Sequence, residues 1–120
     1  MADLQLGTVE ARFADIIWEN EPITSSQIVK LAEKKLCWKK STTYTVLKRL
    51  CDKGIFQNQN GIVTSLIGKE DFSALQSERF VEDTFHGSLP AFLAAFSSRK
   101  RLSEKEVAAL RQLVASYEEE

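Results

Sequence analysis

The segment from Trp38 to Gly54 carries side chains that can do chemistry. At the helical spacing of about 100° per residue, five of its positions share an apolar arc: Thr43, Val46, Leu47, Leu50 and Cys51. The opposite arc carries hydroxyls and cations: Ser41, Thr42, Thr45, Lys48 and Arg49. Hydroxyls and threonine methyls can read base edges, whereas Lys and Arg hold phosphates. The pattern fits either a DNA-reading helix at residues 41–53 or an ordinary surface helix with a solvated polar face.

Positive charge gathers around this helix. Between Lys30 and Lys53 there are eight basic and two acidic residues, although the formal net charge of the whole chain is −1. Residues 69–120 hold seven basic and ten acidic residues. This uneven distribution favours a nucleic-acid partner. The slightly negative net charge of the whole chain predicts that a monomer binds DNA weakly when the sequence is non-specific.

The sequence offers no pattern typical of catalysis or metal binding. The one histidine, His86, has no Ser, Cys or carboxylate near it in a recognisable arrangement, and two isolated cysteines make no metal-ligand pattern. No apolar run approaches the roughly 20 residues that span a bilayer, and the N-terminus lacks the features of a signal peptide. We therefore expect a cytoplasmic protein that is not an enzyme, needs no cofactor or metal and does not insert into membranes.

Two further helices precede the candidate reading helix. Four apolar residues predict an inward face on a helix over residues 7–19: Val9, Phe13, Ile16 and Ile17. The segment 21–23 breaks that helix, and Thr24 with Gln27 predicts a capping-box start for a second helix that runs to about Lys35. Two helices, a turn at residues 36–40 and an amphipathic third helix have the order of a helix-turn-helix unit.

After Gly54 the hydrophobic period changes from that of a helix to that of a strand. Residues 55–57 and 62–67 read as strands, and Asn60-Gly61 between them is a strong hairpin signal, since both residues tolerate positive φ. A hairpin directly behind a helix-turn-helix is a wing. Residues 1–68 are therefore predicted to form a winged helix-turn-helix domain of three helices and a β-hairpin.

The remaining residues, 69–120, read as three helices: 68–85, a short apolar one at 91–96, and one opened by a capping box at residues 103–106. Such an arm has little core of its own, so its apolar surface packs either on the winged unit or on a second copy. Extended helices joined by short turns favour the second copy. The fold class is thus mainly α, with a C-terminal helical dimerisation arm whose predicted interface is Phe85, Phe92, Leu93, Phe96, Val107, Leu110 and Val114.

Several short motifs follow one another along nearly the whole chain. They are L-G-T-V-E at 6–10, I-I-W at 16–18, P-I-T at 22–24, W-x-x-x-T-x-x-T-x-L-x-R-L-x-x-K-G at 38–54, F-V-E-D-T-F-H-G-S-L at 80–89 and L-S-E-K-E at 102–106. In this order and spacing the chain resembles the penicillinase-repressor family of winged-helix transcriptional regulators. That family includes the β-lactamase and methicillin-resistance repressors and the copper-responsive repressors.

The resemblance implies a homodimer that binds a palindromic operator in double-stranded DNA and represses a resistance-type gene. It places the third helix in the major groove and makes Thr42 and Thr45 base-reading candidates. Ser41, Lys48, Arg49 and Lys53 become phosphate or flanking contacts, and Arg49 alternatively braces the fold. The full set of candidate DNA-binding residues is Lys39, Lys40, Ser41, Thr42, Tyr44, Thr45, Lys48, Arg49 and Lys53.

The chain departs from the family pattern at the residues that carry regulation in other members. In the antibiotic-resistance repressors a membrane-bound sensor protease cuts before a Phe in the dimerisation arm. Phe96 resembles that residue, but Ala95 precedes it where those repressors carry Asn. No cysteine follows Cys51, which excludes copper sensing through a C-terminal cysteine cluster.

Two other departures keep a second hypothesis open. Asp52 lies on the same polar arc as Thr45 and Lys48, and the wing segment 57–61 has no Lys or Arg. These features fit a winged-helix protein-interaction module that does not bind DNA, whereas the basic segment from Lys30 to Lys53 argues against that alternative.

Overall fold

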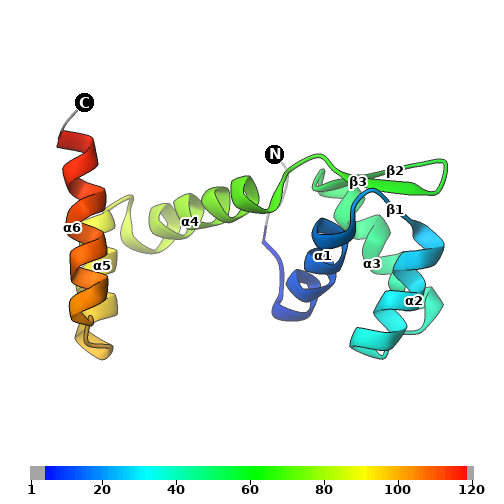
Figure 1. The fold of residues 1–120 in the computed structure, drawn as a ribbon, viewed down its shortest axis with the longest axis horizontal. Coiled ribbons are helices and arrows are strands. Elements are labelled where there is room, and N and C mark those ends of the chain that lie inside the picture. The colour runs from blue at the N-terminus through cyan, green and yellow to red at the C-terminus, as the bar shows by residue number, and fades with distance from the viewer. Residues whose placement is uncertain (1–4, 119–120) are drawn as a thin grey trace. The chain divides into compact units, whose positions relative to one another are not determined.

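The computed structural model describes residues 5–118 and is mainly helical, with a small antiparallel sheet in its first half (Figure 1). The chain forms two compact units, one up to Glu78 and one from Arg79 onward. A winged helix followed by a helical region confirms the predicted fold class. The two units are described separately below.

Three helices make up most of the first unit: α1 (Thr8–Asn20), α2 (Ser25–Leu36) and α3 (Lys40–Asp52). The capping box predicted for α2 is confirmed, because Gln27 N donates to Thr24 Oγ1 and Thr24 N donates to Gln27 Oε1, both over 3.2 Å. α2 ends at Leu36, and the left-handed backbone of the next residue, Cys37 (φ 58°), lets Trp38 N donate back to Ala32 O over 3.4 Å. These local signals set the short turn that separates α2 from α3.

The core of the first unit lies between the three helices and the sheet. Its fully buried side chains include Phe13 and Ile17 of α1, Ile28 of α2 and Leu50 of α3. The prediction that Val9 faces inward is wrong, since 49% of that residue is exposed. Val9 stands in the first turn of α1, and at this end of the helix Leu6 packs against the core instead.

The sheet has three strands in the order β1-β3-β2, all antiparallel: β1 (Ile23–Thr24), β2 (Phe56–Gln59) and β3 (Ile62–Ser65). The predicted hairpin is present, and Asn60 (φ 55°) and Gly61 (φ 84°) form its turn. β1 was not predicted, because two residues show no periodicity. It pairs with β3 through Ile23 opposite Val63, which ties the start of α2 to the wing.

Helix α4 (Lys69–Phe85) begins within the first unit. Phe72 is only 3% exposed, and its ring centroid lies 5.4 Å from that of Trp18 on α1. Lys69 Nζ is 3.0 Å from Asp15 Oδ1, also on α1. Packing therefore divides the chain inside α4, whereas the predicted division stood before it at residue 68.

The second unit contains the end of α4, α5 (Leu89–Arg99) and α6 (Glu104–Glu118). α5 and α6 lie side by side (Figure 1). Three rings from α4 and α5, those of Phe80, Phe85 and Phe92, meet edge to face with centroids 5.7–6.0 Å apart. Ser103 caps α6, because its Oγ accepts from Glu106 N over 3.1 Å and its N–H donates to Glu106 Oε1 over 3.0 Å. Hydrogen bonding from the Ser103 backbone, and next from its side chain, lowers the pKa of the Glu106 carboxyl.

Candidate nucleic-acid interface

Helix α3 presents two opposite faces, as its sequence predicts. Thr43, Val46, Leu47 and Leu50 are buried against the first unit. The other face is exposed and consists of Ser41, Thr42, Tyr44, Thr45, Lys48 and Arg49. The buried hydroxyl of Thr43 donates to Lys39 O over 3.2 Å, so α3 buries no unpaired polar side chain. The apolar face thus holds α3 in place and leaves the polar face open to a partner.

The two threonines on the exposed face differ in what they offer. Thr45 Oγ1 donates to Ser41 O over 2.9 Å, which turns its hydroxyl hydrogen toward the backbone. Thr45 therefore presents a methyl group and an acceptor oxygen, which suit a thymine methyl and a base amino group. The side chain of Thr42 has no hydrogen-bond partner among residues 5–118, so its hydroxyl can donate or accept.

The start of α3 suits an anion. Lys39 stands at the N-cap but makes no side-chain capping bond, and the first turn has no acidic residue. Backbone N–H groups at the start of a helix attract phosphates, because they lack partners within the helix. Lys40 adds a cation that lies 6.0 Å from the ring centroid of Tyr44. These features place an anion-attracting point at one end of the exposed face.

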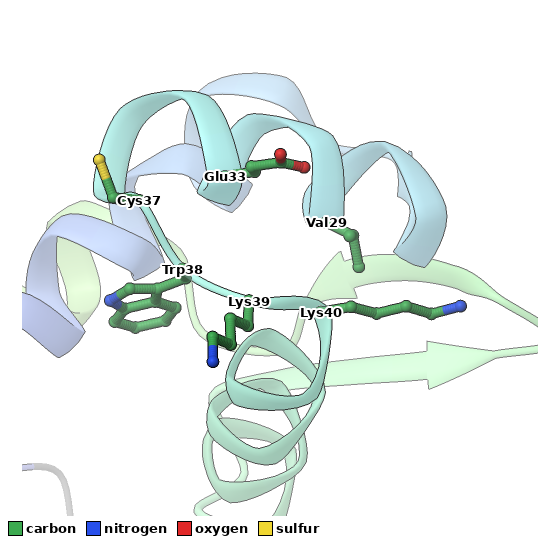
Figure 2. A pocket seen from close by; sticks show the side chains of 6 residues that line it. All are labelled: Val29, Glu33, Cys37, Trp38, Lys39 and Lys40. Carbon is green, nitrogen blue, oxygen red and sulfur yellow. The ribbon is translucent and has the colours of Figure 1, made fainter.

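A hollow of about 530 Å³ adjoins this point (Figure 2). Its lining comes from α2, the α2–α3 turn and the first residue of α3: Val29, Glu33, Cys37, Trp38, Lys39 and Lys40. Lys39 and Lys40 point in different directions from the start of α3 (Figure 2). The Trp38 ring lies 5.1 Å from that of Phe13, which anchors the turn to α1. Glu33 faces the same hollow and offsets part of the positive charge.

Two of the predicted phosphate contacts bind their own chain. Arg49 Nη1 donates to Glu10 Oε2 over 3.3 Å, and Lys53 Nζ donates to Gln5 O over 2.8 Å. Both join α3 to the segment that begins α1. In contrast, Lys48 is exposed and has no side-chain partner in the described part of the chain. The geometry favours Arg49 as a brace and leaves Lys39, Lys40 and Lys48 as the cations that face solvent.

Sequence reasoning did not find Glu10 as the partner of Arg49. Both residues stood in motifs of the family resemblance, but they are 39 positions apart. Nothing in the local pattern of either helix brings them together. The contact depends on how α1 packs across the end of α3.

The wing adds no positive charge to this surface. Its side-chain amides form hydrogen bonds within the hairpin: Gln57 Nε2 donates to Thr64 Oγ1 over 3.1 Å, and Asn58 Oδ1 accepts from Gly61 N over 3.0 Å.

Asp52 is exposed on the outer side of α3. Burial, and next the charge of Asp52, raise the pKa of the half-buried Cys51 thiol. The wing and the end of α3 therefore add no unengaged cation to the positive side chains of α2, the α2–α3 turn and the start and middle of α3.

The predicted interface residues of the second unit remain accessible in the single chain. No residue of α5 or α6 within the described range is buried, and Phe96 and Val114 are 42% and 57% exposed. Two shallow apolar hollows of about 390 and 380 Å³ lie on these helices. Phe92, Leu93, Phe96 and Leu110 line the first, and Val107, Leu110 and Val114 line the second. Phe85 contributes to the cluster of aromatic rings instead.

Residues 5–118 hold no group of three His, Cys, Asp or Glu side chains placed to share a metal ion. Within the same range no helix has both the length and the apolar character that crossing a bilayer requires.

Comparison with known proteins places the whole chain in one family. The family described as penicillinase repressor matches residues 6–116. The penicillinase repressor of Bacillus licheniformis is 24% identical over 117 residues, covering 94% of this chain and 91% of that protein. The methicillin resistance regulatory protein MecI of Staphylococcus aureus is 24% identical over 114 residues, covering 92% and 93%. The chain therefore belongs to the penicillinase repressor family, whose members are transcriptional repressors and not enzymes.

Proposed function

We propose that this chain represses a resistance-type gene by binding, as a homodimer, a palindromic operator with α3 in the major groove. One observation carries the proposal: a member of a repressor family exposes a face of hydroxyls and cations on its third helix. This face consists of the six exposed residues named above, of which Arg49 is engaged by Glu10. Its cations can hold phosphates, and its hydroxyls and threonine methyls can discriminate between bases.

Each side chain has a role that follows from its surroundings. Thr42 and Thr45 read base edges, because one has an unengaged hydroxyl and the other presents its methyl and an acceptor. Lys39 and Lys40 each offer a cation to the DNA backbone at the start of α3, and Lys48 offers another further along. Arg49 and Lys53 position α3 through their contacts with residues 5–10.

The homodimer follows from the second unit. In a single chain, α5 and α6 bury no described residue and leave large apolar side chains in water. Packing against a second copy covers this surface with the same surface, as a two-fold interface requires. It also links two reading helices, so that the second half-site is bound at a high effective concentration. A linked pair compensates for the few phosphates that one unit neutralises.

Regulation by cutting the arm is compatible with this arrangement. Ala95 and Phe96 are exposed and lie inside α5, so a sensor protease would need to unwind α5 locally before cutting between them. Such a cut separates the apolar surfaces that hold the dimer. The proposed partners are operator DNA and a second copy of the chain, and a membrane sensor protease would be a third if the arm is cut here and not controlled by a ligand.

A protein-interaction module is the second candidate. Two observations favour it: the exposed Asp52 at the end of α3 and a wing whose described residues carry no cation. Both weaken attraction to phosphates. A module of this kind would bind DNA feebly and without regard to sequence.

Selection from a random duplex library separates the two candidates. The full-length protein is mixed with randomised 30-base-pair DNA, and the bound fraction is sequenced after several rounds. The proposal expects enrichment of inverted half-sites about 10 base pairs apart, or a multiple of that distance. An unenriched library would favour the interaction module, because the basic surface would then act without reading bases.

A further inference from the structure

The first turn of α4, together with the chain that leads into it, is attached to the reading helix through a short series of backbone hydrogen bonds. Ile55 N donates to Leu50 O at the end of α3 over 3.2 Å. Ile55 O in turn accepts from Leu66 N over 2.8 Å and from Ile67 N over 3.2 Å. Residues 66–72, which we call the α4 root, are therefore attached through Leu66 and Ile67 to Ile55, shortly after the end of α3.

Trp18 of α1 fixes the same root from another side. Its Nε1–H donates to Ile67 O over 3.0 Å. Its ring packs against two others, with its centroid 5.3 Å from that of Phe56 and 5.4 Å from that of Phe72. One side chain thus contacts the wing strand β2, the connection before α4 and the first turn of α4.

An ion pair completes the attachment. Lys69 Nζ lies 3.0 Å from Asp15 Oδ1, and both side chains are partly exposed. Trp18 and Asp15 are three positions apart on α1, so they hold the root from one side of that helix. Trp18, Phe72 and Lys69 therefore leave little freedom in the direction in which α4 starts.

We propose that Trp18 and Lys69 are positioning residues that fix the start of α4 relative to α3 and thereby set which half-site spacing the protein accepts. This inference rests on the proposed function, since it needs a dimer bound to two half-sites. In such a dimer the two reading helices are connected through two copies of α4. A rigid root fixes the direction in which α4 leaves each winged unit and so narrows the separations that the two reading helices can adopt, whereas a loose root allows more of them.

The geometry of DNA explains why the start of α4 would affect the choice of half-site spacing. Inserting one base pair between half-sites moves them apart by about 3.4 Å and rotates them by roughly 34° about the helix axis. A dimer with rigid roots cannot follow that change without straining or losing one contact. A dimer with loose roots follows it at the cost of a lower effective concentration at the preferred site.

The test uses the full-length protein and the palindrome that the wild type selects from a random library. Affinity is measured on that palindrome and on versions with one base pair added to or removed from its centre. For the wild type we expect at least about a tenfold loss of affinity on both altered sites. For Trp18→Phe, which keeps a ring but removes the N–H donor, and for Lys69→Gln, we expect the loss to shrink to about threefold.

Arg79→Gln is the matched control for Lys69→Gln. It removes the cation of the Arg79–Asp83 pair, whose two members both belong to α4. We expect this control to keep the wild-type preference for spacing.

The outcomes separate this inference from the proposed function. A variant that binds all three sites more weakly by the same factor, with the spacing preference intact, would show that the root stabilises the fold without positioning α4. Lys69→Gln keeps this distinction available if Trp18→Phe fails to fold, because Lys69 lies at the surface. Wild-type protein that selects a palindrome but tolerates the altered spacings would overturn the inference alone. Failure to select any palindrome would overturn both.

Discussion

Arg49 on α3 donates a hydrogen bond to the carboxylate of Glu10 on α1 over 3.3 Å. Glu10 Oε1 also lies 3.4 Å from Gly7 N, which caps the start of α1. One carboxylate therefore joins the first helix to the outer side of the reading helix. A cation engaged in this way adds less to the positive field on DNA than an unpaired one does.

The Arg49–Glu10 pair should show a small but measurable coupling. We expect the effects of Arg49→Ala and Glu10→Ala on the free energy of unfolding to differ from additivity by about 0.2–1 kcal/mol, because both side chains are partly exposed. Urea unfolding of the two single variants and the double variant measures this energy. Strictly additive effects would mean that the contact contributes nothing to stability.

Phe72 lies in the segment predicted to belong to the dimerisation arm, but it should contribute strongly to the stability of the first unit. Phe72→Ala removes a buried ring from beside Trp18, and we expect a loss of about 3–5 kcal/mol. Leu75→Ala is the control on the same helix, since Leu75 is exposed and should change stability by about 0.5 kcal/mol or less. Urea unfolding followed by tryptophan fluorescence compares them, and equal losses would place Phe72 outside the core.

The local patterns of the sequence predict much of this fold. The two faces of α3, the capping box at Thr24 and the Asn60-Gly61 turn each depend on residues close together in the chain. The features that could not be predicted depend on distant packing. β1 has two residues and pairs with β3, and Phe72 joins a core built mostly from earlier residues. Val9 follows the helical period, but its turn of α1 extends beyond the core.

The same distinction applies to the candidate interface. Periodicity is enough to place Thr45 and Lys48 on the exposed side of α3. It cannot show that Arg49 and Lys53 turn back toward Glu10 and Gln5, because those partners come from the other end of the winged unit. The resemblance offered both roles for Arg49, and the geometry favours the bracing role.

The two cysteines should differ in reactivity. Cys37 is exposed, whereas Cys51 is half-buried and burial raises the pKa of its thiol. A raised pKa means less thiolate at a given pH, so at about pH 8 we expect iodoacetamide to modify Cys51 at least about tenfold more slowly than Cys37. Mass spectrometry of timed digests follows both sites, with denatured protein as the control in which the rates converge. Faster modification of Cys51 in the native protein would contradict its burial.

Val114 tests the proposed dimer without disturbing the single chain. It is 57% exposed, so Val114→Glu should leave α6 folded but weaken self-association by about 2 kcal/mol or more if it lies at the interface. Leu66→Glu introduces the same charge at an exposed apolar residue of the first unit and should leave the dimer intact. Sedimentation equilibrium compares the two variants with the wild type. A monomeric wild type at micromolar concentration would refute the dimer.

The most direct test of the central claim, that the exposed face of α3 binds and reads DNA, compares Thr45→Ala with Lys48→Ala. Affinities of the wild type and both variants are measured on the selected palindrome and on scrambled DNA at several salt concentrations. We expect Thr45→Ala to cost roughly 1–3 kcal/mol on the palindrome and little on scrambled DNA. Lys48→Ala should weaken binding to both DNAs and flatten the slope of log affinity against log salt by about one unit. Equal, salt-independent losses for the two variants, or none for either, would contradict the claim.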